Sequence, residues 1–171
     1  MDYQANYYAY VEQHKMLAKI PEVKLDNYAY RNKGGAEFED VTARWGLNIP
    51  SFSNGAAYGD LDNDGDLDLV INNINDKAFI YKNTIDSGNY IRVELIGKPN
   101  NREAIGATIE YESSQVKGFY EHTIYRGYLS SMDSKIFLGL GQDSVVNLTV
   151  TWPDGKVSKL LNQKAGQLLN I

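Results

Sequence analysis

The C-terminal half of the chain alternates apolar and polar residues with a period of two. Apolar residues occupy every second position over residues 91–95, and the alternation recurs over residues 107–112 and 147–152. Because successive side chains of a strand point to opposite faces, this pattern predicts antiparallel strands with one buried face. Residues 152–156 (WPDGK) predict a tight turn. Short strands joined by turns indicate an antiparallel β-sandwich or small barrel.

The N-terminal part of the chain follows other patterns. Apolar and aromatic residues of segment 3–20 recur at close to helical spacing, which predicts a helix that ends before Pro21 and packs on a neighbouring surface. The branched apolar run at residues 67–71 predicts a buried strand. The polar segment 84–89 predicts a domain boundary. The expected regions are a helix and linker at 1–27, a second region at 28–86 and a β-domain at 87–171.

Residues 60–68 read DLDNDGDLD, with five aspartates on alternate positions and a glycine at the sixth place. Two carboxylates about 5 Å apart repel by about 0.8 kcal/mol in water, and by more where water is partly excluded. A cation among them would remove this repulsion, and hard oxygen ligands around a tight loop suit Ca²⁺. The expected ligands are the side chains of Asp60, Asp62, Asp64 and Asp68 and the backbone carbonyl of Asp66.

Three other interpretations of this loop fit the sequence less well than a calcium site. An EF-hand or dockerin-like loop needs an acidic group at its twelfth position, which is Ile71 here. A strand rather than a helix is predicted to follow the loop. Mg²⁺ is a weaker candidate because it keeps its waters and a strict octahedron. A plain polar turn gives no reason for carboxylates to recur on alternate positions.

A calcium loop followed directly by a strand resembles the FG-GAP/VCBS-type repeats of β-propellers. Three further stretches carry the resemblance: 30–42 (YRNKGGAEFEDVT), 53–59 (SNGAAYG) and 78–83 (AFIYKN). The resemblance implies one propeller-type blade unit over residues 28–86. A propeller needs about four or more blades of about 40 to 50 residues each. We therefore expect this chain to be a piece of a longer protein, whose missing blades are its partners.

The C-terminal region resembles the ASPIC/UnbV domain, which commonly follows such repeats in exported bacterial proteins. The residues that carry this resemblance are 101–107 (NREAIGA), 127–133 (GYLSSMD), 138–141 (LGLG) and 150–156 (VTWPDGK). The family usually has phenylalanine where this chain has Leu138, a change that keeps the position apolar. The family has no established catalytic residues. The resemblance implies an extracellular or cell-surface, outer-membrane-associated location in a bacterium.

Composition narrows the function classes. The net charge of −5 and the pI of about 5.0 argue against nucleic acid as a partner, since nucleic acid binds basic surfaces. Cysteine is absent, so neither disulfides nor thiol chemistry is available. No apolar run approaches the roughly 18 residues that a membrane-spanning helix needs, so no such segment is expected.

Candidate catalytic residues are few. His14 and His122 are far apart in sequence, and no Gly-x-Ser-x-Gly motif accompanies them. A glycosidase pair could be drawn from three glutamates on predicted strands, but their alternation with apolar residues predicts that they face solvent. The three glutamates are Glu110, Glu112 and Glu121. Three tyrosines could form an aromatic platform for sugar rings or could be ordinary packing residues: Tyr120, Tyr125 and Tyr128.

Together these patterns predict an all-β chain: one propeller-type blade unit with a calcium loop and an N-terminal helix, then a β-sandwich or small barrel. The expected function is a non-catalytic, calcium-stabilised extracellular module for binding or adhesion. The alternative is an accessory, carbohydrate-binding region of a polysaccharide-processing enzyme. A glycan or a protein of the extracellular space is the expected ligand.

Overall fold

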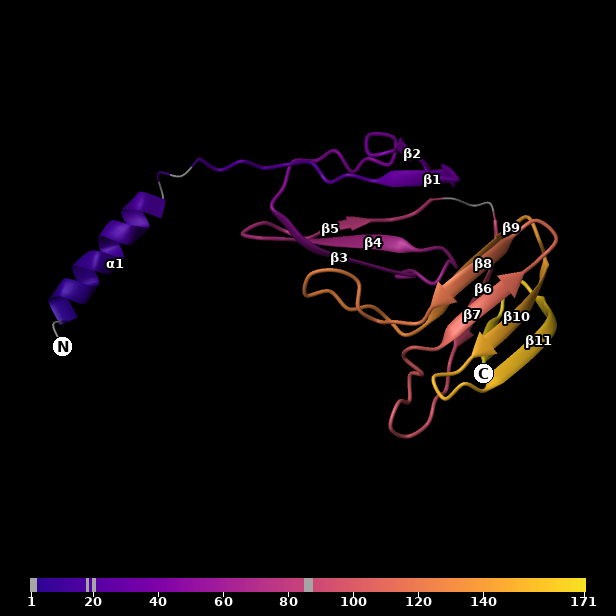
Figure 1. Ribbon diagram of the computed structural model, residues 1–171. Helices are drawn as coiled ribbons and strands as arrows, with labels where there is room; N and C mark the ends of the chain where they lie inside the picture. Colours follow the sequence, from indigo (N-terminus) through magenta and orange to yellow (C-terminus); the bar gives the residue numbers. More distant parts are fainter. Residues whose placement is uncertain (1–2, 18, 20, 85–87) are drawn as a thin grey trace. The chain divides into compact units, whose positions relative to one another are not determined.

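The computed structural model describes residues 3–17, 19, 21–84 and 88–171 (Figure 1). The chain forms two compact units, residues 1–52 and residues 53–171. The division falls within the region expected at 28–86, and the predicted boundaries after residues 27 and 86 stay predictions. No helix in the described ranges is both long and apolar enough to cross a membrane.

The described residues of the first unit form one helix and one hairpin. Helix α1 (Tyr3–Leu17) confirms the helical periodicity expected for residues 3–20, of which residues 18 and 20 lie outside the described part. Several of its apolar side chains are exposed, so docking of the helix on a neighbouring surface stays a prediction. The exposed residues are Tyr7, Tyr8, Tyr10 and Met16. Strands β1 (Tyr30–Gly34) and β2 (Glu37–Asp40) pair antiparallel through a turn at Gly35 and Ala36.

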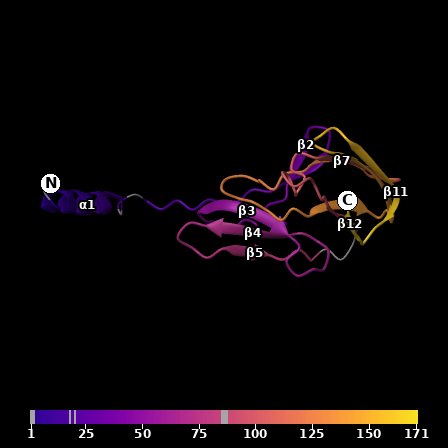
Figure 2. The same cartoon turned by 90° about the horizontal axis from the view of Figure 1, so that it is seen from below.

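The second unit begins with a three-stranded antiparallel sheet, whose strands lie side by side in Figure 2. Its strands are β3 (Ser53–Gly59), β4 (Asp68–Asn73) and β5 (Phe79–Tyr81), in the order β3-β4-β5. Gly59 pairs with Asp68, so residues 60–67 form the connection between β3 and β4. The predicted buried strand is confirmed in part, because Ile71 is buried while Leu69 and Val70 are half-buried.

Two further sheets complete the second unit. The first has the order β11-β10-β7-β8 and the second has the order β12-β6-β9. The strands are β6 (Asn89–Glu94), β7 (Thr108–Glu112), β8 (Lys117–Glu121), β9 (Ile136–Gly141), β10 (Val145–Thr151), β11 (Val157–Lys164) and β12 (Leu168–Asn170). Strand β12 runs parallel to β6, so the expectation of purely antiparallel pairing is wrong at this edge. After β11 the chain passes from one sheet to the other, where β12 joins β6, and a local pattern does not specify this change of sheet.

These two sheets enclose one hydrophobic core. Ile91 and Val93 of β6, Ile109 of β7 and Leu148 and Val150 of β10 are at most 1% exposed. The alternation in the sequence therefore assigned the buried face of these strands correctly. Trp152 is an exception, since it is only half-buried at the margin of the core. Its position follows from the turn that begins there, where the backbone amide of Trp152 donates to the carbonyl of Lys156 at 2.8 Å.

The protein is thus mostly β, with several small sheets and a short helix. Among the described residues there is neither a closed barrel nor a propeller, so the small-barrel alternative is not found. The two larger sheets stay open at their edges, because strands β8 and β11 end one sheet and β9 and β12 end the other.

Candidate metal centre

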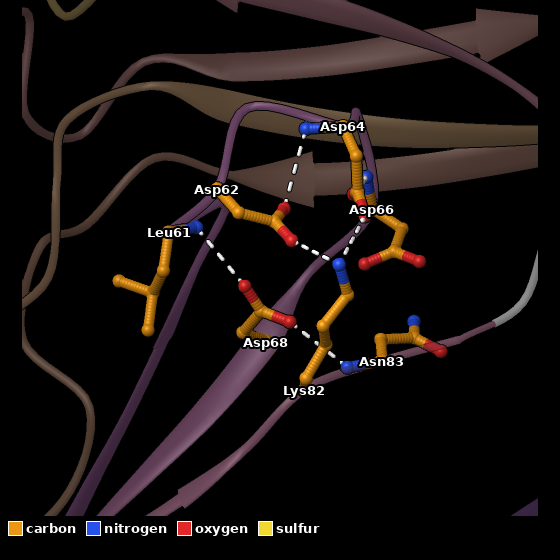
Figure 3. Close-up of polar contacts among 7 residues, drawn as sticks. All are labelled: Leu61, Asp62, Asp64, Asp66, Asp68, Lys82 and Asn83. Carbon is orange, nitrogen blue, oxygen red and sulfur yellow. Dashed lines mark hydrogen bonds and ion pairs between the residues drawn. The ribbon is translucent and has the colours of Figure 1, made fainter.

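The aspartate loop lies where strand β3 turns back into β4. Two successive Asx-type hydrogen bonds organise it (Figure 3). The amide of Asp64 donates to Asp62 Oδ1 at 3.3 Å, and the amide of Asp66 donates to Asp64 Oδ1 at 3.2 Å. Gly65 has a φ of 97°, in the left-handed region that favours glycine. A Cβ at this position would also collide with the ring of Tyr90, so both the turn and the close approach require glycine.

The loop gathers carboxylate oxygens closely enough to hold one ion. Single oxygens of Asp60, Asp62 and Asp64 all lie within 4.8 Å of one another. The side chain of Asp60 is only 5% exposed, and both of its carboxylate oxygens are buried without a hydrogen-bond partner. Oδ1 of Asp66 is also buried without a partner. Since buried polar atoms are normally hydrogen-bonded, these orphaned oxygens fit a hard cation such as Ca²⁺.

Asp68 has a different environment from the other aspartates. Its side chain is buried, its Oδ2 accepts from the amide of Leu61 at 3.1 Å and its Oδ1 accepts from the amide of Asn83 at 2.8 Å (Figure 3). The carboxylate therefore fastens the start of the loop to the end of β5. Each carboxylate oxygen can accept more than one interaction, and the assignment of Asp68 as a ligand stays a prediction.

One cation already lies beside the loop. The ammonium of Lys82 contacts Asp62 Oδ2 and lies 3.4 Å from Asp64 Oδ2 (Figure 3). This contact lowers the pKa of Asp62 below its ordinary value and raises the pKa of Lys82. The pKa of Asp66 is raised, first by burial and then by the negative charges of the neighbouring aspartates. One ammonium therefore neutralises only the outer side of the cluster.

Strand β6 contributes a second positive charge. Nη1 of Arg92 lies 3.7 Å from Asp60 Oδ2, a distance too long for a hydrogen bond, and Nε of Arg92 is buried without a partner. The guanidinium also lies over the ring of Tyr90, with 5.9 Å between its Cζ and the ring centroid. No sequence pattern pointed to Arg92, Tyr90 or Lys82 as neighbours of the loop, because they reach it from other segments: Lys82 follows β5, and Tyr90 and Arg92 lie on β6.

The remaining candidates do not assemble into a second cluster of this kind in the described ranges. Glu110, Glu112 and Glu121 are exposed, as expected. His122 is buried, and neither ring nitrogen has a hydrogen-bond partner; burial lowers its pKa. The side chain of His14 lies outside what the structure describes.

The three tyrosines expected as a platform or as packing residues differ in their exposure, and the platform stays a prediction. Tyr120 packs against the core, and its hydroxyl accepts from Nη2 of Arg126 at 3.0 Å. The rings of Tyr125 and Tyr128 are about two-thirds exposed. Of the three residues, only these two present open rings to solvent.

Comparison with known proteins places both regions of the chain in families. No curated protein matches the chain. Residues 22–71 match the FG-GAP-like repeat, a segment that ends in β4 just beyond the aspartate loop. Residues 97–171 match the family described as ASPIC and UnbV, which covers β7 to β12. Both resemblances seen in the sequence are therefore confirmed. This chain contains an FG-GAP-like repeat at residues 22–71 followed by an ASPIC/UnbV domain at residues 97–171.

Proposed function

We propose that this chain is a non-catalytic, calcium-stabilised module for extracellular binding or adhesion, and that it is part of a longer bacterial repeat protein. The observation that carries the calcium assignment is the set of buried carboxylate oxygens without a hydrogen-bond partner, namely both oxygens of Asp60 and Oδ1 of Asp66. Arg92 lies 3.7 Å from Asp60 and makes no hydrogen bond to it, so a divalent cation would supply the ligand bonds that these buried oxygens lack. Calcium would therefore stabilise the folded loop rather than take part in chemistry.

Calcium suits this donor set better than the other common ions. All of the offered ligand atoms are oxygens, and no cysteine or histidine lies in the loop. Ca²⁺ accepts six to eight oxygens in flexible geometry, whereas Mg²⁺ requires a near-ideal octahedron. Asp60, Asp62 and Asp64 would hold the ion through their side chains, with Asp66 and Asp68 as the further expected ligands.

The role within a longer protein is supported by apolar side chains that the first unit leaves in solvent. Tyr28, Tyr30, Phe38 and Trp45 are each more than half exposed, and the rings of Tyr28 and Tyr30 stack on each other with 6.5 Å between their centroids. Large exposed apolar patches mark interaction surfaces. We propose that neighbouring blades of the same polypeptide cover these side chains, with the FG-GAP-like repeat serving as one propeller-type blade.

The proposal that the chain is not an enzyme follows from the arrangement of its titratable groups. A catalytic site needs such groups together in a concave, partly dry place. The densest acidic cluster is the aspartate loop, and its ligands would surround the ion. The glutamates lie on exposed strand faces and the His122 side chain is buried, so neither is held in a concave, partly dry site.

Isothermal titration of the purified chain with CaCl₂ tests the calcium assignment. We expect one site with a Kd of roughly 10⁻⁴ to 10⁻³ M, as in other extracellular modules. Asp64→Ala should abolish the binding heat, while Asp26→Ala, which removes an exposed aspartate outside the loop, should leave it unchanged. A folded wild-type protein that binds no calcium would refute the assignment.

A further inference from the structure

Two segments that lie about fifty residues apart in the sequence line one pocket of the second unit. The pocket has a volume of about 450 Å³, in the range of small-ligand sites. One wall comes from residues 96–104, after β6, and the other from residues 152–156, between β10 and β11. Parts of both segments also carry the ASPIC/UnbV resemblance. The proposed metal site uses neither wall, so the pocket is a separate site.

The first wall is held rigidly by backbone and side-chain hydrogen bonds. The amide of Gly97 donates to the carbonyl of Arg102 at 2.8 Å. The side chain of Asn101 bonds to Ile105 twice: Nδ2 donates to its carbonyl at 2.9 Å, and Oδ1 accepts from its amide at 3.0 Å. A site built on such a wall needs little ordering when a ligand arrives, which favours affinity.

The second wall presents an aromatic ring in a fixed position. The indole of Trp152 packs against the core on one side, and its Nε1 donates to Ser158 Oγ at 2.9 Å. The WPDGK turn closes with Gly155 N donating to the Trp152 carbonyl at 2.8 Å. Pro153 and Ile96 add to the apolar lining of the pocket. A half-buried, immobilised indole offers a flat apolar surface to a ligand.

Charged groups surround this apolar surface. Nζ of Lys98 pairs with Asp154 Oδ2 at 2.8 Å and thereby joins the two walls. This hydrogen bond is the largest cause of a lowered pKa at Asp154, so the carboxylate is ionised. Lys156 lines the same pocket. With two ammonium groups and one carboxylate, the charged lining carries a net positive charge.

We propose that this pocket binds an acidic saccharide, with one sugar ring against Trp152 and its carboxylate directed to Lys156. The C–H face of a sugar ring is apolar and its rim carries hydroxyls, which matches an indole bordered by lysine, aspartate and asparagine. The net positive charge selects a uronic acid over a neutral sugar. This inference rests on the proposed role as a binding module and names its ligand class.

The test compares two trisaccharides that differ only in charge: trigalacturonic acid and its carboxyl-reduced counterpart, a galactose trimer. Titration calorimetry follows binding, and indole fluorescence is recorded in a Trp45→Phe background so that it reports Trp152 alone. The measurements are made with EDTA and repeated with CaCl₂, because uronates also chelate calcium. Circular dichroism checks that each protein is folded under each condition.

We expect the acidic trimer to bind at least tenfold more tightly than the neutral one. Lys156→Ala should weaken its binding by tenfold or more, and Lys159→Ala, at an exposed lysine outside the pocket lining, should not. Trp152→Phe replaces the indole with a smaller apolar ring and should weaken the binding of both trimers. Equal affinity for the two trimers, no effect of Lys156→Ala, or no binding to the folded protein would overturn the pocket proposal. A retained calcium response would show that the proposed metal site stands independently.

Discussion

Replacing Asp60 with asparagine should change the stability of the second unit in opposite directions with and without calcium. Asparagine is nearly isosteric with aspartate. The side chain of Asp60 is 5% exposed, and neither of its oxygens has a hydrogen-bond partner. In the absence of calcium the substitution removes a buried negative charge that repels its neighbours. In the presence of calcium it replaces a charged ligand with a neutral amide oxygen, which holds the ion more weakly.

The magnitude without calcium follows from distances in the loop. At 4.8 Å, the upper bound for the Asp60 pairs, each of two acidic neighbours repels Asp60 by about 0.9 kcal/mol at the dielectric of water and about 3.5 kcal/mol at an effective dielectric of 20. Arg92, at 3.7 Å, attracts it by about 1.1 or about 4.5 kcal/mol in the same two limits. Repulsion outweighs attraction in both limits. Because Lys82 partly neutralises the neighbours, we expect Asp60→Asn to stabilise the calcium-free protein by about 0.5 to 1.5 kcal/mol.

The magnitude with calcium follows from mass action. For a Kd of roughly 10⁻⁴ to 10⁻³ M, about 10 mM calcium stabilises the wild type by about 1.4 to 2.7 kcal/mol. The variant should gain little of this, so the order of stability should reverse when calcium is added. Urea denaturation in EDTA and in CaCl₂ measures both effects. Asp26→Asn, the same charge change at an exposed site in the other unit, is the control. A variant that is less stable than wild type in EDTA, or that keeps the full calcium response, would refute the reasoning.

Three further outcomes are expected. Lys82→Met should raise calcium affinity several-fold by removing a competing cation, whereas Lys77→Met should not, as titration calorimetry can show. Burial lowers the pKa of His122, so its neutral form is favoured in the folded state; stability should be complete above pH 6.5 and fall as the pH drops toward the folded pKa. His122→Leu should remove that part of the pH dependence in denaturation at pH 7.5 and pH 5.5; an unchanged slope contradicts the assignment. Leu148→Ala should cost about 2 to 5 kcal/mol and Leu161→Ala almost nothing, because the two side chains are 1% and 65% exposed.

The sequence predicted what depends on local spacing. Alternation placed Ile91, Ile109 and Val150 in the core, since the period of a strand fixes which side chains share a face. The alternate aspartates likewise predicted a loop whose carboxylates converge, and Asp60, Asp62 and Asp64 do converge. The residues of a short hairpin connection have few other arrangements, so this part of the site could be predicted from the sequence.

What the sequence could not predict depends on pairing between distant segments. Asn83 reaches Asp68 because β5 pairs with β4, and Lys82 follows from the same pairing. The burial of His122 depends on its contacts with a distant strand segment, where its amide donates to the carbonyl of Ala107 at 2.8 Å. The half-burial of Trp152 likewise depends on its packing against the margin of the core. No local pattern specifies these neighbours.

The period of a strand also links the metal loop to the second domain. Tyr90 and Arg92 are two residues apart on β6, so they share one face, and they meet Gly65 and Asp60 of the loop. The intervening Ile91 points to the opposite face and is fully buried in the core. The strand thus carries loop contacts on one side and core contacts on the other. An ion that draws the loop together would favour the conformation in which the loop contacts Tyr90 and Arg92 on this face of β6. We therefore expect calcium to stabilise the β6 core cooperatively with the loop rather than to order the loop alone.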